Sequence, residues 1–254
     1  MVDDKKRVFK DSLVKIKEKI KGVFSDRLPS GITGLDKIME GGFKRNSTNL
    51  VGGGAGSGKS IFAMQFLING IDKYNEPGIY ISFEEDKKKV IDEFDGFGWE
   101  LAKKVKDGKL MILNYSPQQV ERIVAYGGGT VRDAVESIKA KRLVIDSLTA
   151  FTLLHKGELK KRKAMLELFD RIRSWGCTAI LTQEQEPNSE EHLSSPLEFE
   201  VDSVILLYYL KKGNMRQRFL EVFKMRGTQH SSKIYPMTIN RKGGVTVYSD
   251  HEEG

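Results

Sequence analysis

"TNLVGGGAGSGKSIFAMQFLING", residues 48–70, is the stretch of this chain that decides the expected fold. An apolar strand-like run leads into a glycine-rich turn, and an amphipathic helix-like run leads out of it. Gly53, Gly58, Lys59 and Ser60 match the pattern G-x-x-x-x-G-K-S. Glycines let backbone N–H groups turn inward around phosphate oxygens, and the N-terminus of the following helix adds partial positive charge. The stretch therefore predicts a phosphate-binding loop, in which Lys59 reaches the β- and γ-phosphates and the Ser60 hydroxyl ligates Mg²⁺.

On both sides of this loop, short apolar runs rich in branched residues alternate with helix-like runs. The strand-like runs are NSTNLVGG (46–53), GIYISF (78–83), KLMILN (109–114), RLVIDS (142–147), CTAILTQ (177–183) and VDSVILLYYL (201–210). Continuous apolar strands joined by helices predict a mostly parallel sheet covered on both faces. Three further runs, 216–226, 233–240 and 244–249, follow one another with only turns between them. The predicted fold is therefore α/β, with a central parallel sheet and a C-terminal antiparallel extension.

Polar side chains at the ends of these strands are expected to face the phosphates. Asp146 ends a buried run and would hold Mg²⁺ through water at the carboxyl edge of the sheet. Glu84 and Glu85 stand side by side after another strand, so one could orient or deprotonate the attacking water while the other tunes it. Thr182 and Gln183 could sense whether a γ-phosphate is present. The alternatives are a plain strand end for Asp146 and a solvated acidic turn for the two glutamates.

Composition narrows the class of protein. A chain of 254 residues, 39% hydrophobic and 30% charged, is typical of a globular protein with a full core. Cys177 is the only cysteine, which excludes an intrachain disulfide and favours a reducing cytoplasm. The run 204–210 is too short to span a bilayer, and no secretory signal pattern is expected at the N-terminus. The net charge of +7 permits a nucleic-acid or acidic partner without requiring one.

The N-terminal segment differs from the rest of the chain. Residues 8–24 are predicted to form a basic amphipathic helix, with an apolar stripe of Phe9, Leu13, Ile16, Ile20 and Val23. We expect this helix to pack on its own domain or on another subunit; docking on an anionic surface is the alternative. The predicted division is an extension at 1–26 and a single domain at 27–254.

The order of motifs resembles a single KaiC-type domain of the RecA-like ATPase superfamily. The resemblance covers residues 27–248, through RLPSGITGLDKIMEGGF (27–43), GGGAGSGKS (52–60), EPGIYISFEED (76–86), FGW (97–99), VIDSLTA (144–150) and KMRGTQHS (224–231). It implies a ring of subunits, usually six, with ATP bound at each interface. It implies that the loop contacts the phosphates through Gly53, Gly54, Ala55, Gly56, Ser57, Gly58, Lys59, Ser60 and Ile61, and that Phe97 lies near the adenine.

The resemblance also gives a role to the late motif KMRGTQHS. It implies that Lys224, Arg226, Thr228 and His230 of an adjacent subunit contact the nucleotide, with Asn240 and Arg241 near its base or ribose. Strand alternation places Leu220, Val222, Lys224 and Arg226 on one face, so the two cations are expected to project together. Such a cation, aimed at a neighbour's γ-phosphate, is an arginine finger. Without the resemblance, the segment would be interpreted as an exposed cationic hairpin.

Two other activities of the superfamily match the sequence less well. Autophosphorylation needs hydroxyl groups before the strand DSVILL, where this chain has Glu198 and Phe199; Ser194 and Ser195 lie a few positions early. DNA binding is disfavoured because the loop 184–200 carries six glutamates and no lysine or arginine. The segment HKGELKKRK (155–163) is basic and keeps DNA as an alternative, although a solvated helix start explains it as well.

The sequence thus predicts a Mg²⁺-dependent, cytoplasmic, oligomeric ATPase that acts as a nucleotide-dependent switch for a protein partner. The catalytic group is expected to comprise Lys59, Glu84, Glu85, Lys224 and Arg226. A scaffold that binds ATP to assemble without much hydrolysis is the first alternative, and a recombination-related DNA-binding ATPase is the second.

Overall fold

The structure is a computed structural model that describes residues 26–126, 129–185 and 196–249. The predicted N-terminal helix at 8–24 lies outside the described residues, as do Ser194, Ser195 and most of the glutamate-rich loop after residue 185. Within the described ranges, no helix has the length and apolar character needed to cross a membrane.

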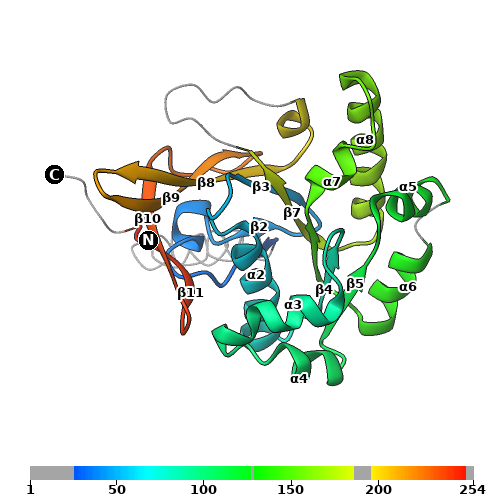
Figure 1. Ribbon diagram of the computed structural model, residues 1–254, viewed down its shortest axis with the longest axis horizontal. Helices are drawn as coiled ribbons and strands as arrows, with labels where there is room; N and C mark the ends of the chain where they lie inside the picture. The colour runs from blue at the N-terminus through cyan, green and yellow to red at the C-terminus, as the bar shows by residue number, and fades with distance from the viewer. Residues whose placement is uncertain (1–25, 127–128, 186–195, 250–254) are drawn as a thin grey trace, which may run out of the picture.

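One large sheet forms the centre of the molecule (Figure 1). Among the described residues it contains nine strands in the order β11-β10-β9-β8-β3-β7-β6-β4-β5. The strands from β8 to β5 in this order are parallel, and β9, β10 and β11 continue the sheet antiparallel, as the sequence predicted. Their bounds are β3 Thr48–Gly53, β4 Gly78–Ser82, β5 Leu110–Asn114, β6 Arg142–Asp146, β7 Thr178–Glu184, β8 Ser203–Lys212, β9 Met215–Met225, β10 Ile234–Asn240 and β11 Gly244–Val247.

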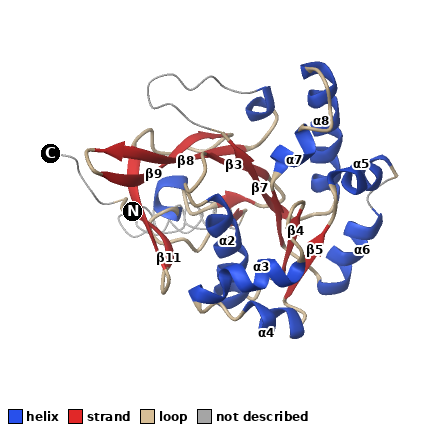
Figure 2. Ribbon diagram, viewed as in Figure 1, coloured by secondary structure: helices blue, strands red, loops and turns tan. Residues whose placement is uncertain are grey.

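Helices cover both faces of this sheet (Figure 2). One face carries α2 (Lys59–Tyr74), α3 (Lys87–Phe94) and α4 (Leu101–Lys106), and the other carries α5 (Pro117–Ala125), α6 (Gly129–Ile138), α7 (Leu148–Thr152) and α8 (Glu158–Ser174). The short elements are β1 (Arg27–Leu28) paired with β2 (Phe43–Lys44), and the 3-10 turns η1 (Asp36–Met39), η2 (Asp95–Phe97) and η3 (Pro196–Phe199).

Successive residues of the central strands belong to different cores. In β3, Leu50 packs in the core under α5 to α8, while Val51 packs in the core under α2. Both side chains are fully buried. A strand covered on both faces has no solvent-facing side, which explains why its sequence reads as a continuous apolar run rather than an alternating one.

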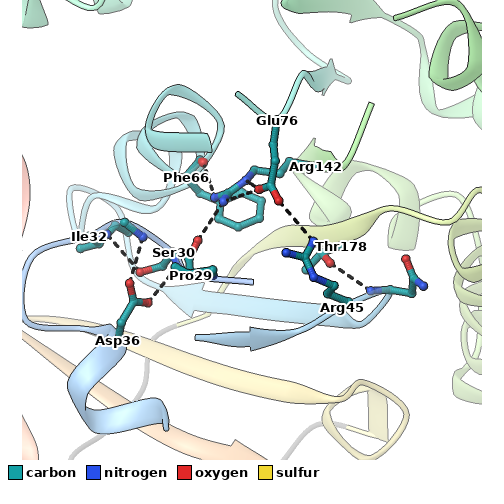
Figure 3. Close-up of polar contacts among 11 residues, drawn as sticks. Pro29, Ser30, Ile32, Asp36, Arg45, Phe66, Glu76, Arg142 and Thr178 are labelled. Atoms are coloured by element: carbon teal, nitrogen blue, oxygen red, sulfur yellow. Dashed lines mark hydrogen bonds and ion pairs between the residues drawn. The ribbon is translucent and has the colours of Figure 1, made fainter. Parts of the chain in front are cut away.

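A buried arginine joins several segments at the amino edge of the parallel strands (Figure 3). Arg142 opens β6 and is completely shielded from solvent. Its guanidinium donates to the Phe66 carbonyl of α2 at 3.0 Å, to the Pro29 carbonyl at 2.9 Å, and to the Glu76 carboxylate at 2.7 and 2.8 Å. Glu76 also accepts a hydrogen bond from Arg45. The guanidinium thus holds the N-terminal segment, α2 and the loop before β4 against β6.

We predict that Arg142→Met lowers the free energy of unfolding by about 3–5 kcal/mol, because it leaves the Glu76 carboxylate without its buried partner. Urea unfolding followed by circular dichroism measures this loss. Arg132→Met is the matched control, since Arg132 forms an exposed ion pair with Glu136 on α6 and should change stability by less than about 1 kcal/mol. Equal losses in the two variants would contradict the role given to Arg142.

Candidate functional site

Four parallel strands end side by side around one cavity. Register pairs Gly53 of β3 with Glu184 of β7, and Ser82 of β4 with Asp146 of β6. The cavity has a volume of about 160 Å³. It is lined by Lys59, Ser60, Tyr80, Ser82, Glu84, Glu85, Glu93, Asp146, Ser147 and Glu184. The structure therefore brings together the loop lysine and serine, the strand-end aspartate and the glutamate pair, at the edge where open α/β sheets bind ligands.

The glycine-rich loop has the geometry of an anion cradle. Gly56 and Gly58 have positive φ angles of 74° and 103°, which glycine adopts without strain. A Cβ on Gly53 would lie 2.6 Å from both the Leu207 carbonyl oxygen and the Ser57 hydroxyl, so the strand end accepts only glycine. Helix α2 starts directly after this loop, without a side-chain cap and without an acidic residue in its first turn. Its first N–H groups and its positive dipole end are thus left for a ligand.

Lys59 folds back over the loop that it follows. Its ammonium donates to the carbonyls of Gly53 at 2.8 Å and Gly54 at 3.0 Å. Burial lowers the pKa of Lys59, and the carboxylates of Glu184 and Asp146 partly offset that change. The Lys59 ammonium therefore places a positive charge among acidic groups, where it would neutralise the charge of phosphate oxygens.

Asp146 is fixed by hydroxyl groups from two neighbouring strands. Tyr80 of β4 donates to the carboxylate at 2.6 Å, and the Thr182 hydroxyl of β7 forms a second, short hydrogen bond to it. Thr182 is predicted to sense a γ-phosphate, and in the structure the hydroxyl of this fully buried residue bonds to Asp146. Tyr80 was missed, because an aromatic residue in an apolar strand shows no polar signal in the sequence.

The glutamate pair is positioned by the turn after β4. The Ser82 hydroxyl accepts the backbone N–H of Glu85 at 2.8 Å and of Glu84 at 3.3 Å. Glu84 is exposed, whereas Glu85 is half-buried and pairs with Lys89 of α3 at 2.6 Å. The hydrogen bond from Lys89 lowers the pKa of Glu85.

Glu93 of α3 is a further carboxylate at this cavity, and it was not predicted. Burial, followed by its hydrogen bond with Glu85, raises the pKa of Glu93 to about 7. Burial disfavours the charged carboxylate, and the nearby Glu85 carboxylate disfavours a second negative charge. Nothing in the sequence around Glu93 signals this, because in sequence it is one of several charges on an amphipathic helix.

Gln183 and Glu184 end β7 beside the loop. The Gln183 Oε1 atom is buried and has no hydrogen-bond partner in the part of the chain that the structure describes. The Ser57 hydroxyl of the loop is buried and unpartnered in the same way. Buried polar atoms normally find a partner, so these two atoms fit a polar ligand at the loop.

The β8–β9 hairpin extends past the loop and supports it. Arg218 donates two hydrogen bonds, at 2.9 and 3.1 Å, to the Gly56 carbonyl, and its guanidinium stacks on the Tyr209 ring at 4.3 Å. Tyr209 lies near the end of β8 and Arg218 lies on β9, both far from the loop in sequence. Neither was predicted, since no short motif links positions so distant.

Arg241 lies beside the turn that carries Phe97. Phe97 stacks on Trp99 with ring centroids 4.6 Å apart. Arg241 follows β10, and its Nε atom lies 3.7 Å from the point where a Cβ of Gly96 would stand. Ile239, one residue before Asn240, covers Gly58 of the loop. Of these residues, Ile239 thus contacts the cradle directly.

Lys224 and Arg226 lie at the other edge of the sheet from this chain's own loop. Met225 pairs with Ser203, the first residue of β8, whereas Gly53 pairs with Leu207, four residues further along β8. At 3.2–3.4 Å per residue this separation is about 13 Å along the strands, before the loop itself begins. The chain does not bring these cations to its own cavity.

The predicted alternation through Lys224 is wrong because β9 contains an irregularity. The register with β8 shifts between Val204 and Ile205, so Lys224 pairs with Val204 and Val222 with Ile205. Leu220, Val222 and Met225 pack in the core under α2, and Lys224 therefore lies on the opposite face, with η3.

Both cations do project together, toward η3. Lys224 donates to the Glu198 and Val201 carbonyls at 2.6 and 2.9 Å, and Arg226 donates to the Phe199 carbonyl. Burial and the neighbouring guanidinium of Arg226 lower the pKa of Lys224. Thr228 and His230 follow in the loop that binds η1, where Ser231 donates to the Ile38 carbonyl at 3.1 Å.

The basic segment after β6 is the start of α8. Lys161 pairs with Glu158 at 2.9 Å, and Arg162 pairs with Glu200 at 2.6 Å. Two of the cations that made DNA binding an alternative, Lys161 and Arg162, thus form ion pairs within the chain.

Comparisons with known proteins agree with this geometry. The sequence model of the family described as "ATPase: KaiC" matches residues 28–252. The circadian clock oscillator protein KaiC of Thermostichus vulcanus is 35% identical over 229 residues, which is 87% of this chain and 44% of that protein. KaiC of Synechococcus elongatus is 35% identical over 224 residues, covering 84% of this chain and 42% of its own length. The chain thus spans less than half the length of these curated relatives.

A solved structure matches over nearly its whole length. The crystal structure of the KaiC-like protein of the hyperthermophilic archaeon Pyrococcus horikoshii has a TM-score of 0.76 and 37% sequence identity, covering 87% of this chain and 98% of that one. The chain belongs to the KaiC family of nucleotide-binding ATPases and has its RecA-like fold.

Proposed function

We propose that this protein binds ATP with Mg²⁺ in the cavity at the glycine-rich loop and hydrolyses it in a homo-oligomeric ring, usually of six subunits. The observation that carries the proposal is the position of Lys224 and Arg226, at the sheet edge away from this chain's own loop. In a ring, that edge of one subunit faces the loop of the next. ATP then lies between two subunits and is contacted by both.

The cavity supplies the groups that a bound nucleotide needs. The N–H groups from Gly53 to Ile61 would hold the phosphates, with Lys59 at the β- and γ-phosphates. Ser60 and Asp146 would hold Mg²⁺, which neutralises charge on the phosphates when it is bound. Tyr80 and Thr182 keep the Asp146 carboxylate oriented for this task. Gln183, Phe97, Asn240 and Arg241 complete the contacts to the γ-phosphate and the base.

Hydrolysis requires a water molecule in line with the γ-phosphate. Glu84 and Glu85 stand across the cavity from the loop, and the turn at Ser82 fixes their backbone. Because Glu85 is engaged by Lys89, the exposed Glu84 is the freer of the two to orient the water. From the next subunit, Arg226 and Lys224 would stabilise charge on the transferred group, with Thr228 and His230 beside them.

The biological role proposed is a nucleotide-dependent switch for a protein partner in the cytoplasm. The domain at 27–254 would carry the ATPase and the segment 1–26 would be an extension. A scaffold that binds ATP and hydrolyses little is the competing possibility, and the carboxylates at the cavity favour the enzyme. DNA binding is disfavoured, because two of the cations at the start of α8, Lys161 and Arg162, are paired with glutamates.

Two variants test hydrolysis at a shared site. Glu84→Gln/Glu85→Gln should lower phosphate release by about 10²–10⁴, and Arg226→Ala by about 10³–10⁵, while ATP affinity stays nearly unchanged in both. Phosphate release and equilibrium binding of ATP, measured in the same buffer, separate the two effects. Wild-type turnover in the double glutamine variant would favour a scaffold that binds ATP without much hydrolysis. Wild-type turnover in Arg226→Ala would exclude the arginine-finger role of Arg226.

The raised pKa of Glu93 gives a second prediction, on stability. The folded state holds this proton more tightly than the unfolded chain, where the ordinary value of 4.5 applies. The free energy of unfolding should therefore fall as the pH rises from about 4.5 to 7, and this part of the fall should vanish in Glu93→Gln. Urea unfolding at pH 5 and pH 8 measures it. Asp92→Asn, a neighbour on the same helix that does not line the cavity, is the control. An unchanged pH dependence in Glu93→Gln would refute the raised pKa of Glu93.

A further inference from the structure

A second cavity, of about 300 Å³, lies on the other face of the sheet between α5, α7 and α8. These helices lie together in Figure 1, and no residue of this cavity lines the nucleotide cavity. Val124, Phe151 and Ala164 give it apolar walls. Its volume is at the lower end of the range of pockets that hold small molecules.

His155 is the polar group inside this cavity. Its side chain is 13% exposed, and its ring packs edge-on against Phe151 with centroids 5.3 Å apart. The Nδ1 atom stands 4.0 Å from the Glu121 carboxylate, and the buried Nε2 atom has no hydrogen-bond partner among the described residues. An unpartnered buried polar atom is unfavourable, so a ligand that bonds to it removes that cost.

Charges of both signs surround the apolar walls. Lys160 and Lys163 of α8 line the cavity, and neither forms an ion pair with a described residue. Glu121 of α5 and Glu167 of α8 supply the opposite charge. A purely anionic ligand would be repelled by the glutamates and a purely cationic one by the lysines. A zwitterion with an apolar body satisfies both sets.

One short segment connects this cavity to the nucleotide site. Asp146 ends β6, and α7 begins two residues later. The Thr149 hydroxyl of α7 accepts the backbone N–H of Glu184 at 2.9 Å, while Phe151 and His155 of the same segment line the second cavity. A ligand that restricts the motion of residues 146–155 would therefore also restrict Asp146 and Glu184, which lie beside the glycine-rich loop.

We infer that the cavity between α5, α7 and α8 binds a free α-amino acid with an apolar side chain, and that this binding is coupled to nucleotide binding through residues 146–155. The carboxylate lies at Lys160 and Lys163, the ammonium at Glu121 and Glu167, and the side chain on Phe151 and its apolar neighbours. Coupling is reciprocal: the amino acid and the nucleotide change each other's affinity by the same factor.

Calorimetric titration of the full chain with L-phenylalanine, without nucleotide, tests binding independently of ATP hydrolysis. Phenylacetate lacks the ammonium and phenethylamine lacks the carboxylate, so each should bind at least about tenfold more weakly. Ala164→Leu fills the cavity and should weaken L-phenylalanine binding by about tenfold or more. Ala102→Leu on α4, the same substitution at an exposed helical position outside the cavity, should bind as the wild type does.

Three results would overturn the inference. They are no heat of binding with L-phenylalanine, an analogue that binds as tightly as L-phenylalanine, or equal binding by Ala164→Leu and the wild type. A repeat titration with ADP in the presence of saturating L-phenylalanine tests the coupling. The affinity for ADP should change by about 5–150-fold, and an unchanged affinity would overturn the connection through 146–155.

Discussion

The arrangement of the candidate site depends on the register of the parallel strands. Because β3, β4, β6 and β7 run in one direction with matched ends, Gly53, Ser82, Asp146 and Glu184 meet at a single edge. The antiparallel strand β9 runs back along β8, so it carries Lys224 and Arg226 to the opposite edge. The same hydrogen-bonded sheet thus assembles the cradle and holds the two cations away from it. Under the proposed function, a complete site therefore needs two chains.

The two edges of the sheet are stabilised by different means. At the amino edge, the guanidinium of Arg142 donates hydrogen bonds to carbonyls and a carboxylate from three segments. Most of its N–H donors are therefore used. At the carboxyl edge, buried polar atoms of Ser57 and Gln183 lack partners within the described residues. A satisfied polar network rigidifies a fold, and unsatisfied groups are kept where a ligand supplies the partner. The unpartnered atoms of Ser57 and Gln183 thus fit a polar ligand at the carboxyl edge.

The sequence predicted the layers, the antiparallel extension and the cluster of Lys59, Ser60, Asp146 and the glutamate pair, because each rests on a local pattern. Contacts between residues far apart in sequence were not predictable. Examples are the hydrogen bonds from Tyr80 and Thr182 to Asp146, and those from Arg218 to the Gly56 carbonyl. The face of Lys224 was predicted wrongly, since one extra residue in a strand reverses the alternation after it and leaves no signature in the sequence. Glu93 was missed because its pKa depends on a neighbour brought close by folding.

The most direct test of the composite site is subunit complementation. Glu84→Gln/Glu85→Gln and Arg226→Ala, each nearly inactive alone, are mixed in equal amounts and allowed to exchange subunits. An interface with intact glutamates on one chain and an intact arginine on the next should then form at about a quarter of positions, and phosphate release should recover to about that fraction of the wild-type rate. Subunit exchange that is complete by mass spectrometry, with no recovery of phosphate release, would contradict the account.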